Sequence, residues 1–195
     1  LKEKNIQSTF VEGLRVTDKE TVKVVEEVLA NDINKQIVES INQSGGKAIG
    51  LAGNKNNLIE ASKLNVQIKD SDSNIEKILD IGFVGQPTKI NTDIIKKHLN
   101  DGYIPVIAPL GIDNNNNNYN INADTVAGHL AGALQASKLL LLTDVAGILD
   151  EQKKLISSLS LEDAERIAVK DFIGGGMKPK ILTCIDAMKK GVPKS

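Results

Sequence analysis

Three polar side chains alternate just ahead of a helix-forming segment, and their spacing suits a ligand-binding edge. Asn120, Asn122 and Asp124 stand two residues apart, so in an extended segment they point to the same side. Residues 125–134 follow as a small-residue helix pattern. A helix start offers free backbone N–H groups and a positive dipole end, which favour a phosphate or a carboxylate. An N-cap role for Asp124, beside turn-forming asparagines, explains the same residues without a ligand.

A glycine-rich loop followed by a lysine is the second stretch suited to phosphate chemistry. Gly174, Gly175 and Gly176 precede a predicted helix that carries Lys180 in its first turn. Glycines let the backbone approach a phosphate closely, and a lysine there could neutralise charge on a phosphoryl group in transfer. The helix dipole disfavours a cation at this end, which supports a functional reason for Lys180. Lys178 and Lys180 could instead be solvated surface charges.

A third candidate segment lies at the end of an apolar run. Residues 138–142, a lysine followed by four leucines, form an apolar run that predicts a central strand covered on both faces, and Thr143, Asp144 and Gly147 follow it. In open α/β sheets, ligands bind at the carboxyl ends of the strands. An ordinary strand-to-loop turn would explain each of these residues separately, but not why they occur together.

Arg15 is a candidate for binding a carboxylate. It stands just before Thr17-Asp18-Lys19-Glu20, a capping-box pattern that opens a predicted helix. A guanidinium at this place is either a surface charge or a fork that holds a substrate carboxylate in two hydrogen bonds.

Helical and strand-like segments alternate around these candidates. The spacing of apolar residues predicts helices over 18–29, 33–44, 91–100 and 125–137, two more opened by Ser160 and Gly174, and strands over 48–53, 81–90, 103–110 and 138–142. Residues 54–79 are interpreted as a polar surface excursion, and 113–118 as a hairpin tip. Strands that alternate with helices predict an α/β sandwich around a mainly parallel sheet.

Composition limits the function classes. The 195 residues, 41% of them hydrophobic, predict one globular domain. The net charge of -1 provides no basic field for nucleic acid or an anionic membrane, and no apolar run has transmembrane length. The lone Cys184 fits a reducing cytoplasm. Because the chain opens at Leu1 without a preceding strand and stops at Ser195 before a receiving one, we expect a fragment cut at both ends.

Four blocks, taken in order, closely resemble the acetylglutamate kinases of the amino-acid kinase family. They are Phe-Val-Glu-Gly-Leu-Arg-Val-Thr-Asp at 10–18, Tyr-Asn-Ile-Asn-Ala-Asp at 119–124, residues 142–150, and the Gly-Gly-Met-x-x-Lys of 175–180. The resemblance extends over nearly the whole chain, and the first two blocks separate it from aspartate, glutamate 5-, carbamate and uridylate kinases. It implies a three-layer α/β/α sandwich around a mainly parallel sheet, truncated at both termini. It also implies ATP-dependent phosphorylation of the γ-carboxylate of N-acetyl-L-glutamate in arginine biosynthesis.

The resemblance assigns a role to each matching residue. Asp124 would organise catalytic lysines, and Lys180 would stabilise the phosphoryl group in transfer. Acetylglutamate would be held by Arg15, Asn120, Asn122 and Ala123. ATP with Mg²⁺ would lie along Thr143, Asp144, Val145, Ala146, Gly147, Ile148, Leu149, Phe172, Ile173, Gly174, Met177 and Lys180, with no metal site on the protein itself. Within one partial domain over 1–195, roughly residues 1–110 would bind acetylglutamate and 111–195 the nucleotide.

The resemblance also implies a cytoplasmic enzyme that forms a homodimer or a larger homo-oligomer, without nucleic-acid or membrane partners. The family's first lysine-bearing strand and a further glycine-rich loop would precede Leu1, so the fragment alone is expected to be inactive. Lys178 departs from the family, which usually has an apolar residue there. Two alternatives stay open: another amino-acid kinase of the glutamate 5-kinase type, or a non-catalytic ligand-binding or sensory module on the same fold.

Overall fold

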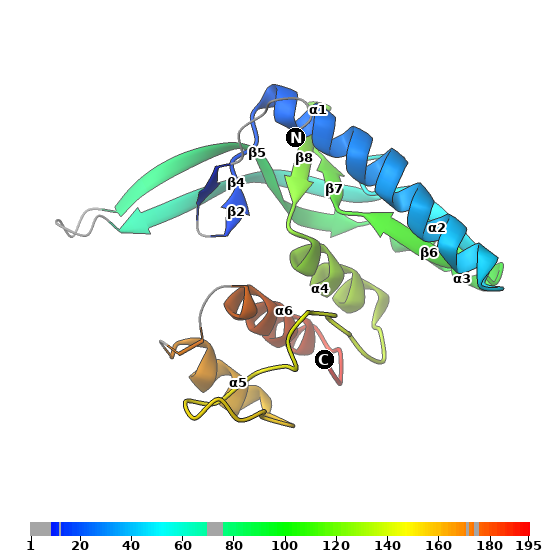
Figure 1. Cartoon of the computed structure of the whole chain (residues 1–195). Coiled ribbons are helices and arrows are strands. Elements are labelled where there is room, and N and C mark those ends of the chain that lie inside the picture. Colours follow the sequence, from blue (N-terminus) through cyan, green and yellow to red (C-terminus); the bar gives the residue numbers. More distant parts are fainter. Residues whose placement is uncertain (1–8, 12, 70–75, 171, 174–175) are drawn as a thin grey trace. The chain divides into compact units, whose positions relative to one another are not determined.

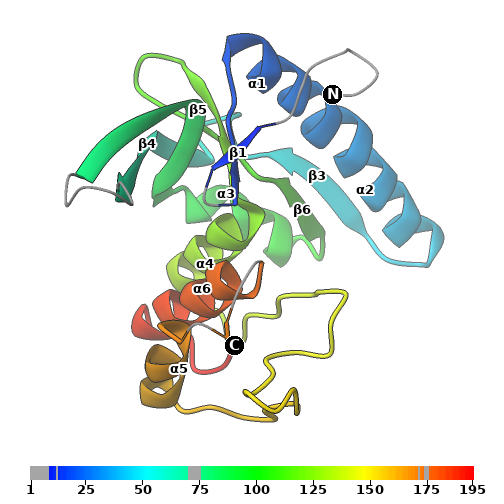
Figure 2. The same ribbon diagram turned by 60° about the vertical axis from the view of Figure 1, so that its left-hand side comes forward.

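The computed structural model describes residues 9–11, 13–69, 76–170, 172–173 and 176–195 (Figures 1 and 2). The chain divides into two compact units between Asn122 and Ala123. The first unit combines strands and helices, and the second is built from helices and irregular segments. Within the described ranges, no helix is long and apolar enough to cross a membrane.

A long helical run opens the first unit. It comprises α1 (Lys19–Glu26), the π-helical segment η2 (Glu27–Ile33) and α2 (Asn34–Gln43), so the two predicted helices form one continuous rod (Figure 1). Asp18 caps the run, since its carboxylate accepts hydrogen bonds from the backbone N–H groups of Glu20 and Thr21. The capping-box pattern predicts Thr17 in that role, so the start of the helix is confirmed but the cap lies one residue later. The run ends where Gly45 adopts φ +86°, a conformation that glycine reaches without strain.

A parallel strand pair lies between helices in the same unit. β3 (Ala48–Ala52) pairs with β6 (Ile104–Ala108) along its full length, and Figure 2 shows this pair between α2 and α3 (Thr92–Asn100). Gly50 allows the helix to approach, because a Cβ there would collide with the Asn34 side chain. The predicted strands over 48–53 and 103–110 and the predicted helix over 91–100 are confirmed, and they form helix, sheet and helix layers.

The predicted surface excursion over 54–79 is wrong, because most of it is strand. β4 (Ile59–Lys69) and β5 (Glu76–Ile90) form a long antiparallel pair. Register shifts between Glu60 and Ala61 and between Lys63 and Asn65 interrupt the alternation from which a strand is recognised in sequence. β5 also passes through Gly85 and Pro87, two residue types that usually interrupt a strand.

A short hairpin completes this sheet. β7 (Leu110–Ile112) and β8 (Asn118–Ile121) are antiparallel, β8 pairs with β5, and β7 closes onto β4 through Glu60 and Ile112. The tip predicted over 113–118 is confirmed. A single carboxylate orders it: Asp113 accepts hydrogen bonds from the backbone N–H groups of Asn115 and Asn117 and from the Tyr119 hydroxyl.

Burial and hydrogen bonding act in opposite directions on Asp113. Loss of solvent raises the pKa of this carboxyl, but the hydrogen bonds from Asn117, Tyr119 and Asn115 outweigh it and hold the pKa below its usual value. On the partner side, burial and the Asp113 carboxylate raise the pKa of Tyr119 to about 12. The run of asparagines is therefore organised by one ionised group.

The described residues of the second unit form three helices, α4 (Ala123–Leu134), α5 (Leu161–Ala168) and α6 (Met177–Lys189). Ser160 caps α5 as predicted, accepting a hydrogen bond from the Asp163 N–H. Two apolar clusters form the core of this unit. They comprise Ala131, Leu139, Ala187 and Val192 in one, and Ala168, Ile173, Ile181 and Ile185 in the other.

The central strand predicted over 138–142 is wrong for this structure. These residues have no regular secondary structure. Leu139 is buried, but Leu140 and Leu142 are 72% and 91% exposed. A central parallel strand needs hydrogen-bonding neighbours on both sides. The described part of the second unit contains only an isolated bridge between Leu149 and Leu155, so no strand there can pair with this segment.

Candidate active site

Arg15 lies at the end of a small hairpin that the sequence analysis missed. β1 (Phe10–Val11) and β2 (Leu14–Arg15) pair in antiparallel register, with Phe10 opposite Arg15. The guanidinium carbon of Arg15 is 4.5 Å from the centre of the Phe10 ring, a cation–π distance that restricts the long side chain. Gly13, with φ +77°, is the one local signal for this turn.

Asn120 lies on β8, and the structure joins it to the segment that follows Arg15. Its amide nitrogen donates a hydrogen bond to Oγ1 of Thr17 over 3.3 Å. Thr17 is completely buried and was not among the predicted site residues. Asn122 follows the strand, and Ala123 opens α4, so these two candidates stand on either side of the division between the units.

Asp124 and Lys180 form the best-defined pair among the predicted residues. Nζ of Lys180 lies 3.0 Å from each carboxylate oxygen of Asp124, and the two side chains are 23% and 20% exposed. Each residue stands in the first turn of its helix, α4 or α6. Asp124 is the second residue of α4 and not the residue before it, so the ion pair replaces the N-cap interpretation.

Two glycines let α4 and α6 approach closely enough for this pair to form. Gly128 and Gly132 follow Asp124 at intervals of four, which places them on one face of α4. A Cβ at Gly128 would lie 2.7 Å from Cγ2 of Thr183, and one at Gly132 would lie 2.9 Å from Cβ of Lys190. The same face of α4 therefore carries both the carboxylate and the space for the lysine-bearing helix.

Lys178 differs from Lys180 although it lies only two residues away. Its side chain is exposed, whereas Lys180 is half-buried against Asp124. The sequence left open whether both lysines are solvated. In the structure only Lys178 is exposed, so its substitution is a suitable control for substitution of Lys180.

The predicted nucleotide segment is mostly open to solvent. Thr143, Asp144, Val145 and Ala146 are exposed, and the Thr143 hydroxyl donates to the Asp144 carboxylate over 3.3 Å. Gly147 has φ +142°, and Leu149 makes the isolated bridge. The polar side chains and backbone groups of this segment are therefore accessible to a ligand from solvent.

Three other residues predicted to line the nucleotide site are packed together. Ile173 is buried in the cluster with α5 and α6, and Ile148 and Met177 pack against it. Phe172, which precedes Ile173 in the chain, is 38% exposed. Gly174 lies outside the described residues, so the structure does not test its predicted role.

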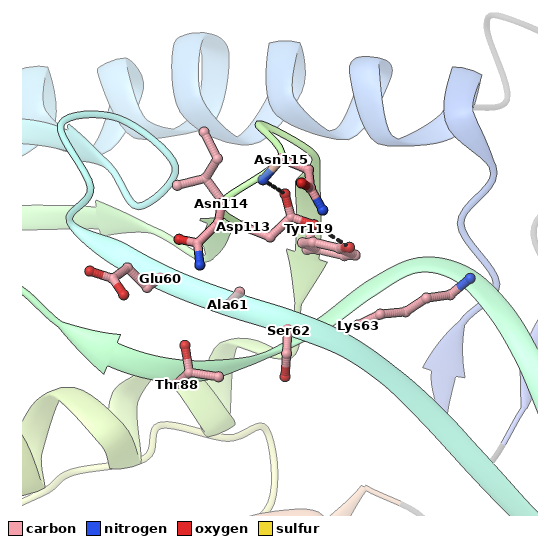
Figure 3. Close-up of a pocket in the computed structure, with 10 residues that line it drawn as sticks. Glu60, Ala61, Ser62, Lys63, Thr88, Asp113, Asn114, Asn115 and Tyr119 are labelled. Carbon is pink, nitrogen blue, oxygen red and sulfur yellow. Dashed lines mark hydrogen bonds between the residues drawn. The ribbon is translucent and has the colours of Figure 1, made fainter.

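A pocket of about 420 Å³ lies elsewhere in the first unit, between β4, β5 and the 113–118 tip (Figure 3). Glu60, Lys63, Thr88, Asn114 and Tyr119 are among its lining residues. Among the residues the structure describes, the pocket is lined by none of the predicted site residues. Tyr119 and Asn120 are neighbours on one strand, so their side chains point to opposite faces, and this pocket is separate from the Asn120 side.

Sequence comparison places the chain in a known family. The model of the amino acid kinase family matches residues 1–195. The chain belongs to the amino acid kinase family. Acetylglutamate kinase from Rhodospirillum centenum is 54% identical over 187 residues, which cover 96% of this chain and 61% of the relative. The enzyme of the same name from Afipia carboxidovorans is 51% identical over 187 residues, covering 96% and 63%. The chain thus spans about three fifths of the length of these relatives.

Solved structures confirm the amino-acid kinase fold. The smu.665 protein of Streptococcus mutans superposes with a TM-score of 0.84 at 29% identity, covering 98% of this chain and 73% of that protein. N-acetylglutamate synthase from Neisseria gonorrhoeae has a TM-score of 0.78 at 23% identity, covering 98% and 41%. Giardia carbamate kinase has a TM-score of 0.60 at 14% identity, covering 87% and 62%. At these lower identities the likeness establishes the fold alone.

Proposed function

We propose that the chain is part of an N-acetyl-L-glutamate kinase of arginine biosynthesis. The enzyme transfers the γ-phosphoryl group of ATP to the γ-carboxylate of N-acetyl-L-glutamate, giving an acyl phosphate and ADP. The relatives that carry this name are 54% and 51% identical over 96% of the chain. The structural observation that supports the proposal most is the ion pair of Asp124 and Lys180, because phosphoryl transfer needs a positioned cation.

The chemistry asks for positive charge and alignment more than for proton transfer. A γ-carboxylate oxygen attacks the γ-phosphorus while the bond from that phosphorus to the β–γ bridging oxygen breaks. The carboxylate is ionised at neutral pH, so the reaction requires no general base. The transition state is loose and spreads charge over the phosphoryl oxygens, where a lysine lowers the barrier. Lys180 supplies that charge in this proposal.

Asp124 holds the lysine in place. An ammonium group has three N–H donors, and the Asp124 oxygens, each 3.0 Å from Nζ, take two of them. The third can reach a phosphoryl oxygen. Because its carboxylate is engaged in this way, Asp124 acts as an organiser of the lysine and not as a base.

The remaining candidates divide by unit. Arg15 and Asn120, in the first unit, bind the carboxylate and amide groups of acetylglutamate, with Asn122 and Ala123 at the boundary. In the second unit ATP lies along residues 143–149 and 172–174, with Met177 and Lys180. Asn120 belongs to the first unit, so this proposal extends the acetylglutamate part beyond the boundary near 110 that the sequence suggests.

Magnesium enters this proposal as part of the nucleotide substrate. Mg²⁺ is usually held by substrate phosphates together with one or two carboxylates. Among the described residues, no three His, Cys, Asp or Glu side chains gather as a metal group. The proposal also places the enzyme in the cytoplasm as a homodimer or larger homo-oligomer, acting on small molecules and not on nucleic acid or membranes.

Substrate choice tests the proposed function. The full-length protein is offered Mg·ATP with acetylglutamate, glutamate or aspartate in separate reactions, and ADP release and acyl phosphate trapped by hydroxylamine are measured. We expect turnover with acetylglutamate alone. Turnover with glutamate would indicate a glutamate 5-kinase type, and ligand binding without turnover would indicate a sensory module.

A further inference from the structure

We propose that Thr17 is a positioning residue for the substrate side of the site, and that its buried hydroxyl fixes the orientation of the Asn120 amide. This inference rests on the proposed function. Thr17 lies between Arg15 and α1 and is 0% exposed. Its hydroxyl contacts two candidate substrate-binding residues, and because buried polar groups are hydrogen-bonded, its proton must be donated to one of them.

The backbone of Thr17 is held by β5 on both sides. Its N–H donates to the Ile81 carbonyl oxygen over 3.0 Å, and its own carbonyl oxygen accepts from the Phe83 N–H over 2.6 Å. Gly82 makes this approach possible, because its φ is +81° and a Cβ there would collide with the Thr17 carbonyl. Thr17 is therefore a fixed point from which its side chain is directed.

The Thr17 hydroxyl has a single proton, and this fixes the direction of both of its hydrogen bonds. Oγ1 of Thr17 lies 2.9 Å from the Arg15 carbonyl oxygen, which can only accept, so the single hydroxyl proton is committed to that bond. Oγ1 is then left as an acceptor for its second neighbour, 3.3 Å away. Asn120 must turn its NH₂ group toward Thr17, because the opposite orientation would place two oxygens together without a proton.

The fixed orientation determines what Asn120 offers to a ligand. With the nitrogen facing Thr17, the carbonyl oxygen Oδ1 points away and can accept a hydrogen bond from a ligand N–H. An acetamido group supplies such a donor. If the hydroxyl were absent, nothing in this contact would prefer one orientation of the amide, and binding would have to select it. Thr17 thus acts on the substrate through Asn120 and need not touch it.

Two substitutions separate this role from simple packing. Thr17→Val keeps the shape and removes the hydroxyl, whereas Thr17→Ser keeps the hydroxyl and removes a methyl group. In the full-length enzyme, we expect Thr17→Val to raise the KM for acetylglutamate about tenfold, the effect of one lost hydrogen bond. The KM for ATP and kcat should stay within about twofold of normal. Thr17→Ser should retain a near-normal KM for acetylglutamate even where its melting temperature falls.

A double-mutant cycle with Asn120→Ala tests whether Thr17 acts through Asn120. Thr17→Val should raise the KM no further in the Asn120→Ala background. The proposal is overturned if Thr17→Val leaves the KM unchanged, if the increase is the same in both backgrounds, or if Thr17→Ser is as impaired as Thr17→Val. Should Thr17→Val fail to fold, Thr17→Cys, with its weak donor and acceptor, takes its place in the cycle.

A spectroscopic measurement keeps this test independent of the substrate. If the unsubstituted enzyme does not phosphorylate acetylglutamate, the proposed function fails, but the orientation of Asn120 remains measurable. The side-chain NH₂ signals of Asn120, identified by their loss in Asn120→Ala, should shift and exchange faster with solvent in Thr17→Val and stay in place in Thr17→Ser. Identical signals in Thr17→Val and the unsubstituted protein would refute the role of Thr17.

Discussion

The two units hold their candidate residues by different means. In the first, Thr17 is buried, bonded through its backbone to β5 and through its hydroxyl to Arg15 and Asn120. In the second, Asp124 and Lys180 meet in one half-buried ion pair between two helices. The predicted nucleotide contacts over 143–146 lie on an exposed segment.

The first unit therefore depends on the position of its backbone, and the second on the charge of one ion pair. In the first unit the geometry depends on close backbone contacts, so substitutions there should change stability and ligand geometry together. In the second unit a single substitution can remove one charged side chain of the ion pair without disturbing a buried backbone contact. Predictions for the two units should therefore differ in kind as well as in size.

The largest effect is expected for Lys180→Ala in the full-length enzyme. Loss of a positioned donor to the transition state costs about 10²–10³ in kcat. The melting temperature should also fall, because the Asp124 carboxylate is only 20% exposed and loses its partner. Lys178→Ala is the matched control, since Lys178 is exposed two residues away. Steady-state turnover of both variants is the measurement. Near-normal turnover of Lys180→Ala would remove the second unit's catalytic role.

The next effect distinguishes two glycines with similar backbone angles. Gly82 and Gly13 have φ of +81° and +77°, but only at Gly82 does an added Cβ meet a backbone oxygen, that of Thr17. The left-handed conformation alone costs alanine about 1 kcal/mol, and overpacking adds about 1–3 kcal/mol. Urea unfolding should show Gly82→Ala to be destabilised by about 3 kcal/mol and Gly13→Ala by about 1 kcal/mol. Equal losses would mean that the contact with Thr17 contributes nothing.

A smaller effect is expected where α4 meets α6. Alanine in place of a helical glycine normally gains about 1 kcal/mol, and Ala133→Gly on the exposed side of α4 should lose that amount. At Gly128 the new Cβ would lie 2.7 Å from Thr183, so we expect a net loss of about 1 kcal/mol together with reduced turnover. A gain in unfolding free energy for Gly128→Ala would show that the helices do not need this approach.

The smallest effect concerns acid stability at the 113–118 tip. The pKa of Asp113 is lower in the folded chain than its usual value. Its contribution to stability is therefore complete above the unfolded pKa, about 3.9, and is lost as the pH falls through the folded pKa. Asp113→Asn should be less stable than the unsubstituted protein at pH 7, and the difference in their free energies of unfolding should be smaller at pH 3. Urea unfolding at both pH values measures it, and a gap independent of pH would rule out the ionised carboxylate as its source.

Sequence reasoning succeeded where the signal is local. The helix starts near Asp18 and Ser160 were predicted because capping patterns depend on residues three apart, although the first cap is Asp18 and not Thr17. Lys180 and Asp124 were selected by residue type and helix position, and the structure brings them together. Their catalytic and substrate roles stay predictions.

Failures occurred where distant segments decide. Strand β4 was missed because its register shifts hide the alternation, and its partner is supplied by β5. The strand predicted over 138–142 rested on apolar residues alone, and pairing requires neighbours that composition cannot reveal. Thr17 was overlooked because its partner Asn120 lies 103 residues away. A buried hydroxyl has no sequence signature of its own.

The central claim is that the first unit binds acetylglutamate and the second binds ATP. The most direct test is to compare both KM values in two variants of the full-length enzyme, Asn120→Ala and Asp144→Ala. We predict that Asn120→Ala raises the KM for acetylglutamate about tenfold and leaves the KM for ATP unchanged, and that Asp144→Ala does the reverse. If Asn120→Ala raised the KM for ATP, or Asp144→Ala that for acetylglutamate, this assignment of the two units would be contradicted.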